Sequence, residues 1–201
     1  MKSKLNTVDI LSLVNDFQRL INMRVNNVYD GNNPQIYFMK LNHAGNKELL
    51  YIESGIRMHT TKINFSVFRD TPSSFAGKLR KHLKNKRIVE ISQVGLDRII
   101  KFKFGEGDYT NYVLFEFHSS GNIILTDKDY KILSQRRYHV YDEENKHFYP
   151  IEKFEKIDFN ETNPLYQVIE KRYRKYPLKI DENSESIDYE KILSKIKNEN
   201  L

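Results

Sequence analysis

The sequence of 201 residues contains no cysteine, and hydrophobic residues make up only 39% of it. Without cysteine there is neither a disulfide framework nor a metal site built on thiolates. No apolar run is long enough to span a bilayer, and the N-terminus lacks the continuous apolar segment of a secretory signal. We therefore expect a soluble, cytoplasmic domain that has no membrane partner.

The short motifs of several enzyme and cofactor classes are also absent. The chain contains no H-E-x-x-H, no G-x-x-x-x-G-K-[ST], no G-x-G-x-x-G after a strand and no G-x-S-x-G. The six histidines are scattered without the spacing of metal ligands. We therefore expect no metal, no cofactor and no enzymatic activity. What the chain does have is 13 tyrosines and 12 phenylalanines, which supply large side chains for a core.

Positive charge is concentrated in one segment. Residues 78–103 contain nine Lys and Arg against two acidic residues, a local net charge of +7, whereas the rest of the chain nets −1. A charge run alone usually marks a solvated helix face, but this run continues into the next hairpin with few acidic residues beside it. Because a concentrated positive field attracts phosphate, nucleic acid is the first partner to consider.

Hydrophobic periodicity and turn residues predict an α+β fold with antiparallel sheets. A first helix is expected to begin at Asn6 or Thr7, and a second to begin at Thr71-Pro72 and end near Asn85. Strands are predicted at residues 25–30, 35–41 and 48–53. Two hairpins are also predicted, one that pairs residues 88–94 with 98–104 and one that pairs residues 112–117 with 122–126. Residues 142–145 are predicted to form a polar turn, and 163–175 and 188–198 to form helices.

The basic helix is the main candidate for phosphate binding. Its apolar residues fall on one face and its cations on the other. The candidate residues are Lys78, Arg80, Lys81, Lys84, Lys86 and Arg87. Arg57 and His59 are further candidates, in a polar run at residues 53–59 that we interpret as a turn after a strand. Interleaved tyrosines offer rings on which bases stack, although most of them are expected in the core or at its rim.

Asp97 and Arg98 follow Gly95 at the mouth of a predicted hairpin. An arginine there can make planar bidentate contacts, and the carboxylate can accept from exocyclic amines or ribose hydroxyls. The simpler interpretation is a turn cap with a surface ion pair. Asp9 lies in the first turn of the first helix, where stabilisation of the helix dipole is the simpler interpretation.

Ordered motifs over the first 130 residues resemble the N-terminal domain of the NFACT family, which includes eukaryotic nuclear export mediator factor and bacterial fibronectin-binding-protein-like relatives. The motifs are TVDI at 7–10, MRVNNVYD at 23–30, ESGIRMHTT at 53–61, PSSFAGKLRKHLKNKR at 72–87, GLDR at 95–98 and SGNIILT at 120–126. The resemblance implies that residues 1–178 form this domain and that 179–201 are a helical extension toward a middle domain.

The resemblance also implies a fold similar to the N-terminal domain of formamidopyrimidine-type DNA glycosylases, with two antiparallel β-sheets flanked by helices. Those enzymes need an N-terminal proline nucleophile. This chain begins Met1-Lys2-Ser3, so we expect glycosylase chemistry to be absent.

Membership would imply a non-catalytic role in ribosome-associated quality control. Family proteins are implied to bind the large ribosomal subunit carrying an obstructed peptidyl-tRNA, and to recruit charged tRNA for template-free C-terminal tailing of the stalled chain. A listerin-type ubiquitin ligase is an implied partner through regions not in this chain. Asp9, Asp97 and Arg98 match family positions that support tRNA recruitment. The alternative is a protein-interaction scaffold whose basic face docks on an acidic partner, since charged protein interfaces also weaken with salt.

Overall fold

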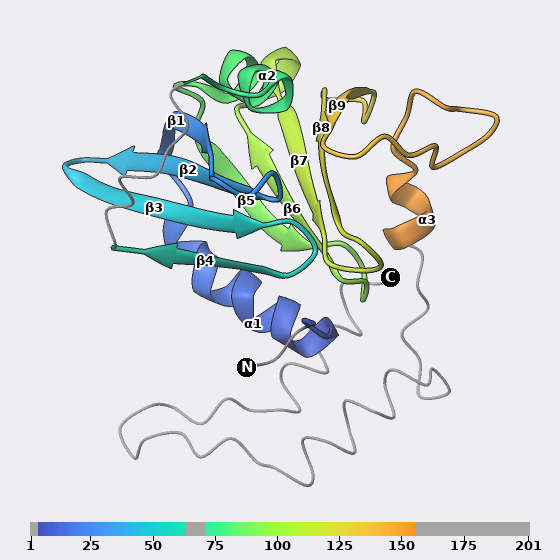
Figure 1. Ribbon diagram of the computed structural model, residues 1–201, viewed down its shortest axis with the longest axis horizontal. Coiled ribbons are helices and arrows are strands. Elements are labelled where there is room, and N and C mark those ends of the chain that lie inside the picture. The colour runs from blue at the N-terminus through green and yellow to red at the C-terminus, as the bar shows by residue number, and fades with distance from the viewer. Residues whose placement is uncertain (1–3, 63–70, 156–201) are drawn as a thin grey trace, which may run out of the picture. The chain divides into compact units, whose positions relative to one another are not determined.

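The computed structural model describes residues 4–62 and 71–155, and these residues form two antiparallel sheets and their flanking helices (Figure 1). The first sheet has the order β1-β2-β3-β4 and the second the order β5-β6-β7-β8-β9. The first sheet comprises β1 (Arg24–Asp30), β2 (Ile36–His43), β3 (Asn46–Glu53) and β4 (Arg57–Thr61). The second comprises β5 (Ile88–Gln93), β6 (Ile99–Phe104), β7 (Asn111–Glu116), β8 (Asn122–Thr126) and β9 (Ile132–Gln135). The predicted α+β class with two antiparallel sheets is confirmed.

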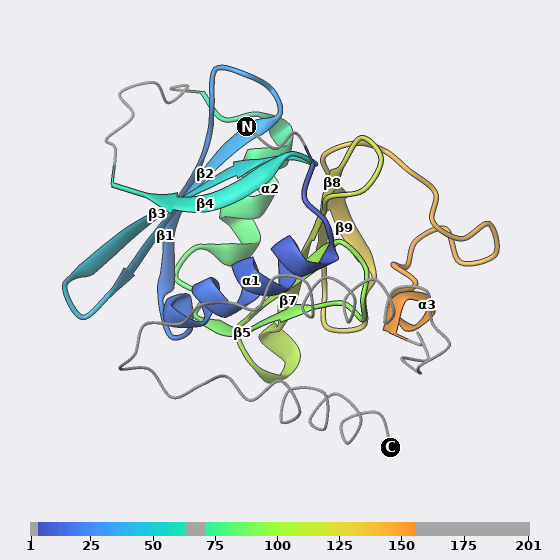
Figure 2. The same ribbon diagram turned by 90° about the horizontal axis from the view of Figure 1, so that it is seen from below.

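Helix α1 (Thr7–Phe17), with the 3-10 turn η1 (Gln18–Leu20), begins where the sequence predicted. The Asn6 side chain accepts from the Asp9 backbone N–H at 2.9 Å, and the Asp9 carboxylate accepts from the Asn6 N–H at 2.7 Å. This reciprocal capping box satisfies two backbone donors that a helix start leaves unpaired. The buried face of α1 then packs into the core, and Figures 1 and 2 show the helix along one end of both sheets.

Helix α2 (Ser74–Leu83) is capped by Ser73, so the predicted start at Thr71 is wrong by two residues. The Ser73 hydroxyl accepts from the Ala76 N–H at 3.1 Å, while the Asp30 carboxylate accepts from both the hydroxyl and the backbone N–H of Ser73. A carboxylate 43 residues away in the chain therefore selects the cap. The helix also stops before Asn85, whose φ of 66° is left-handed and whose N–H donates to the Val25 carbonyl.

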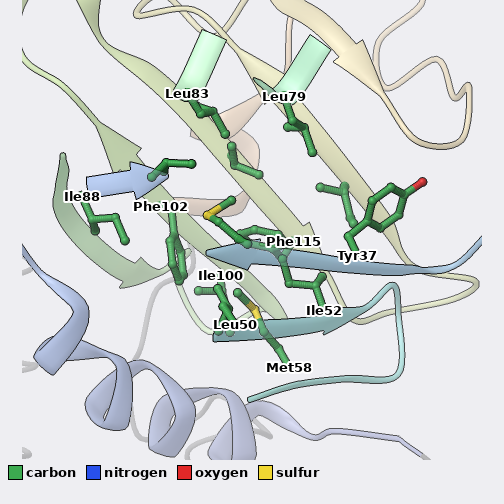
Figure 3. Close-up of a cluster of buried hydrophobic side chains, with 14 of the residues drawn as sticks. Tyr37, Leu50, Ile52, Met58, Leu79, Leu83, Ile88, Ile100, Phe102 and Phe115 are labelled. Atoms are coloured by element: carbon green, nitrogen blue, oxygen red, sulfur yellow. The ribbon is translucent and has the colours of Figure 1, made fainter. Parts of the chain in front are cut away.

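The core lies between the two sheets, with α1 and α2 closing it from opposite ends in Figure 1. Figure 3 shows side chains of β2 to β4, α2 and β5 to β7 converging on one interior; the labelled ones are Tyr37, Leu50, Ile52, Met58, Leu79, Leu83, Ile88, Ile100, Phe102 and Phe115. Fully burying a side chain of this size contributes about 1.5–3 kcal/mol of transfer free energy. The aromatic residues thus build much of the core, as expected.

A second, smaller apolar cluster covers the other face of the second sheet. Its buried members are Val94, Ile99, Leu114, Ile124, Tyr149 and Ile151. Because Ile99 packs into this cluster and Ile100 into the main core, β6 begins buried on both faces, which explains its imperfect alternation in the sequence. The segment that supplies Tyr149 contains the predicted polar turn, which the Asp142 carboxylate holds by accepting from the N–H groups of Glu144 and Asn145.

Two strands and a short helix were not predicted: β4, β9 and α3 (Ile151–Glu155). β4 occupies half of the polar run at 53–59, so only residues 54–56 form the turn, and the interpretation of Arg57 and His59 as turn residues is wrong. The predicted helices at 163–175 and 188–198 lie outside the described residues, as does the predicted boundary near residue 178.

Candidate nucleic-acid interface

The exposed face of α2 and the link that follows it carry the predicted phosphate-binding cations. Phe75, Ala76, Leu79 and Leu83 are buried on the opposite face of the helix. The side chains of Lys81, Lys84 and Arg87 are exposed, and they have no ion pair or hydrogen bond within residues 4–62 and 71–155. These three cations are therefore available to a polyanion.

The other three of the six candidate cations on α2 and the link, Lys78, Arg80 and Lys86, already have partners. Arg80 donates from Nε to the Val28 carbonyl and lies 5.2 Å from the centre of the Tyr29 ring. Lys86 donates from Nζ to the Tyr109 carbonyl and, at 2.5 Å, to the Asn111 side chain. Lys78 reaches the Leu133 carbonyl at 3.4 Å, a long contact that an anion can readily replace. Arg80 and Lys86 thus contribute positive charge and hydrogen bonds within the fold, and are less able to move toward a ligand.

The pKa of His82 reflects the positive charge on this face. Partial burial lowers the pKa of its imidazole below the ordinary value of 6.5, and the charges of Lys81, Lys86 and Lys78 lower it further. Since like charges disfavour the imidazolium, three lysines act on one point of the helix surface. The charge concentration seen in the sequence is therefore a concentration in space.

A second candidate region lies where the turn between β5 and β6 meets the start of α1. The Gln93 amide donates from Nε2 to the Asp97 carbonyl at 2.8 Å and to the Thr7 carbonyl at 3.4 Å. One side chain thus joins the Asp97–Arg98 turn to the first turn of α1, which contains Asp9. The Asp97–Arg98 turn therefore lies next to the first turn of α1, although the contact to Thr7 is long.

Hydrogen bonds fix the backbone of this turn. The Arg98 N–H donates to the Asp97 carboxylate at 2.6 Å, and the Phe117 N–H donates to the Arg98 carbonyl at 2.8 Å. Asp97 is thus a turn cap, as the simpler interpretation predicted. Its expected ion pair is absent: within the described part of the chain the half-buried Arg98 guanidinium has no hydrogen bond or ion pair. The arginine remains available for a planar acceptor.

A buried polar network lies next to this turn. Glu116 lies opposite Ile99 in the sheet and is only 2% exposed. Its carboxylate accepts from the hydroxyls of Tyr149 and Tyr141, each at 3.0 Å. Burial raises the pKa of Glu116. Burial also raises the pKa of the Tyr149 hydroxyl, with Glu116 and, to a smaller extent, Asp97 adding to the shift.

Two turns, one from each sheet, meet beside this network. Gly55 in the β3–β4 turn and Gly121 in the β7–β8 turn both have positive φ, 76° and 65°. A Cβ at Gly121 would lie 2.1 Å from the Gly55 Cα, so the two backbones are in direct contact. Only glycine permits both the conformation and the approach. The contact locks the sheets together at the side where Glu116 and Arg98 lie.

Arg57 and His59 do not join the basic face. They lie on β4, at the opposite edge of the first sheet from β1, against which α2 packs (Figure 1). Arg57 forms an ion pair with Glu53 at 2.6 Å, which raises the pKa of the guanidinium, and His59 stacks on Tyr51 with ring centres 4.9 Å apart. Both side chains are thus partnered within the sheet.

A profile of the NFACT N-terminal and middle domains matches residues 6–197. The chain belongs to the NFACT family.

Named relatives of this NFACT chain are ribosome quality control proteins. It is 43% identical over 159 residues to the ribosome quality control complex subunit NEMF homolog of Drosophila melanogaster, covering 76% of this chain and 16% of that protein. It is 38% identical to Homo sapiens NEMF, covering 82% and 15%, and 33% identical to Saccharomyces cerevisiae ribosome quality control complex subunit 2, covering 81% and 16%. The chain thus spans about one sixth of the length of these relatives.

Solved structures share the NFACT fold at low identity. The N-terminal domain of the fibronectin-binding protein PavA from Streptococcus pneumoniae aligns with a TM-score of 0.61 at 22% identity, over 69% of this chain and 58% of that one. The N-terminal part of the Streptococcus suis fibronectin/fibrinogen-binding protein gives the same TM-score and identity, over 70% and 56%. The likeness to the glycosylase domain stays a prediction.

Sequence reasoning missed the residues that support the site. Gln93, Glu116, Tyr141 and Tyr149 were not candidates, although a glutamate inside the apolar stretch 113–117 was a usable signal, because a buried carboxylate needs donors. Within the described residues no group of three or more His or acidic side chains is arranged to hold a metal ion, and no helix there has the length and apolarity needed to cross a membrane.

Proposed function

We propose that this chain is a non-catalytic module that binds tRNA and the large ribosomal subunit within a ribosome quality control factor. In that role it helps to recruit charged tRNA for template-free C-terminal tailing of stalled nascent chains. The names of the relatives support the pathway, since NEMF and its yeast counterpart are ribosome quality control complex subunits. A listerin-type ubiquitin ligase remains a proposed partner of the whole factor.

The observation that carries the proposal is that Gln93 contacts both the Asp97–Arg98 turn and the first turn of α1, which contains Asp9. The backbone of the turn is fixed, and the Arg98 guanidinium has no partner among the described residues. A fixed arginine beside a carboxylate offers donors and an acceptor at defined positions, which suits the reading of an unpaired base or a ribose. The basic face of α2 supplies phosphate attraction that is independent of sequence.

The roles of the two regions differ. The exposed lysines act through charge, so they raise affinity for any RNA. The Asp97–Arg98 turn acts through geometry, so it discriminates among RNAs. We propose that both are needed, because phosphate contacts position a nucleic acid whereas contacts to bases specify it.

The test is to crosslink this chain to RNA in cell extract and to identify the RNAs recovered. We expect selected tRNAs to be enriched over other RNAs of equal length. A variant carrying Asp97→Ala and Arg98→Ala serves as the matched control, and its recovered RNA should lose the enrichment for tRNA. Recovery of acidic proteins together with an unselective RNA population would contradict the proposal and favour the scaffold alternative.

A further inference from the structure

An exposed tyrosine stands next to the basic link that joins α2 to β5. Tyr109 ends the 3-10 turn η2 (Gly107–Tyr109) between β6 and β7, and 81% of its surface is exposed. A ring of this size contributes most when it is covered, so its exposed surface is available to a partner.

The backbone that carries this ring is fixed. Nζ of Lys86 donates to the Tyr109 carbonyl and to the Asn111 side chain, and burial lowers the pKa of Lys86. The Gly105 N–H donates to the Arg87 carbonyl at 2.9 Å, and a Cβ at Gly105 would lie only 3.0 Å from the Tyr109 carbonyl oxygen. The η2 loop is thus docked closely on the link while the tyrosine ring projects outward.

Cations from two segments lie along the link on which the η2 loop docks. The link pairs with β1, since the Val25 N–H donates to the Lys86 carbonyl at 2.9 Å. Arg24, at the start of β1, donates from Nη1 to the Asn85 carbonyl at 2.9 Å, so its guanidinium lies on the link. Arg24, Lys84 and Arg87 are all exposed.

Two acidic residues lie on the same loop, Glu106 and Asp108. Lys128 offsets the second through an ion pair of 2.8 Å. Cations therefore outnumber acids on the link, the start of β1 and the η2 loop together, and this charge favours an anionic partner.

We propose that Tyr109 is a stacking platform for one unpaired RNA base, with Arg24, Lys84 and Arg87 holding the phosphates of the same strand. This inference rests on the proposed function in taking RNA as the partner, and it adds a second contact point apart from the Asp97–Arg98 turn. An open ring beside cations suits a flipped or loop nucleotide, because such a base has a bare face and an adjacent phosphate. A paired duplex offers no such face along its length.

The test uses a ten-nucleotide single-stranded RNA carrying 2-aminopurine, whose fluorescence is quenched when the base stacks. The full 201-residue chain should quench it, and Tyr109→Phe should quench it equally. Tyr109→Ala should abolish the quenching and weaken binding about fivefold or more, in line with the loss of one stacked base. Tyr138→Ala is the matched control, since Tyr138 is also 81% exposed but is not docked on the basic link.

Two outcomes would overturn the inference: unchanged quenching by Tyr109→Ala, or loss of quenching by Tyr138→Ala instead. A charge-reversal variant with Lys78, Lys81 and Lys84 replaced by Glu separates this failure from failure of the proposed function. If that variant loses RNA affinity while Tyr109→Ala behaves as the unmodified chain, only the stacking role fails. If none of these variants changes RNA binding, the proposed function fails with it.

Discussion

The basic face and the Asp97–Arg98 turn are built in opposite ways. On the basic face, Lys81, Lys84 and Arg87 are exposed and make no hydrogen bond or ion pair within the described residues. At the turn, Gln93, Asp97 and the backbone of Arg98 are held by hydrogen bonds of 2.6–2.8 Å. Mobile charges suit a partner whose phosphates are everywhere alike, whereas a fixed turn suits a partner that differs from its competitors at one place. We therefore propose that affinity and discrimination arise in separate regions.

The largest effect should come from removing the support beneath the fixed region. Glu116→Ala leaves the buried hydroxyls of Tyr141 and Tyr149 without their acceptor and opens a cavity. We expect a loss of about 2–4 kcal/mol in the free energy of unfolding, measured by urea denaturation. Glu143→Ala, which alters an exposed acid, is the control and should change stability by less than about 0.5 kcal/mol. Equal stability of the two variants would show that the network does not hold the fold.

The basic face should respond through charge alone. Replacing Lys78, Lys81 and Lys84 with Glu should weaken binding to every RNA by about tenfold or more, and the slope of log affinity against log salt should fall by about 2. The matched control reverses three exposed lysines elsewhere, Lys47, Lys62 and Lys131, for the same change in net charge. If both triple variants lose affinity equally, net charge rather than the basic face of α2 attracts RNA.

The pKa of Glu116 gives a prediction for pH. Because burial raises the folded-state pKa above the ordinary 4.5, this group favours folding below pH 4.5, and that contribution is lost as the pH rises through the raised value. The free energy of unfolding of the unmodified chain, minus that of Glu116→Gln, should therefore decrease with rising pH over this window. Thermal unfolding of both proteins at a series of pH values measures the difference, and a difference that stays constant would contradict the assigned burial effect.

The smallest effect should come from Gln93→Ala, which removes the side chain that joins the turn to α1. Losing its two hydrogen bonds should cost about 0.5–1.5 kcal/mol of stability. We expect a larger relative loss in tRNA selectivity than in total RNA affinity, measured by competition between tRNA and an RNA of equal length. A proportional loss of both would mean that Gln93 serves the fold only.

Local signals in the sequence predicted most of the fold. The cap at Asn6, the hairpin at Gly95 and the hairpin at Ser119 to Gly121 depend on neighbouring residues, and all three were found. The start of α2 was misplaced because Asp30, distant in sequence, selects Ser73 as the cap. β4 was missed because Arg57 and His59 made a strand with inward Met58 look like a polar turn.

The sequence indicated candidate residues for the site, of which Arg57 and His59 lie apart from the basic face, but not how the structure positions them. The charge concentration and the resemblance to the NFACT family pointed to the cations and to Asp9, Asp97 and Arg98. The sequence did not indicate that Gln93 joins two of these segments, or that Arg80 and Lys86 are engaged by carbonyl groups. Such contacts link residues 23–86 positions apart, and no local pattern encodes them.

The central claim is that the Asp97–Arg98 turn discriminates among RNAs, in addition to the role of Asp97 as the cap of this turn. Asp97→Asn tests this most directly, because an amide oxygen can still accept from the Arg98 N–H while the charge is lost. We would measure melting temperature and tRNA selectivity for Asp97→Asn, Asp97→Ala and Arg98→Ala, and tailing for each variant in the full-length protein. The account predicts near-normal melting for Asp97→Asn and Arg98→Ala, with selectivity for tRNA reduced by roughly 1–3 kcal/mol in all three. The opposite result would contradict it: a lower melting temperature for Asp97→Ala that Asp97→Asn restores, together with intact tRNA selectivity and tailing in every variant.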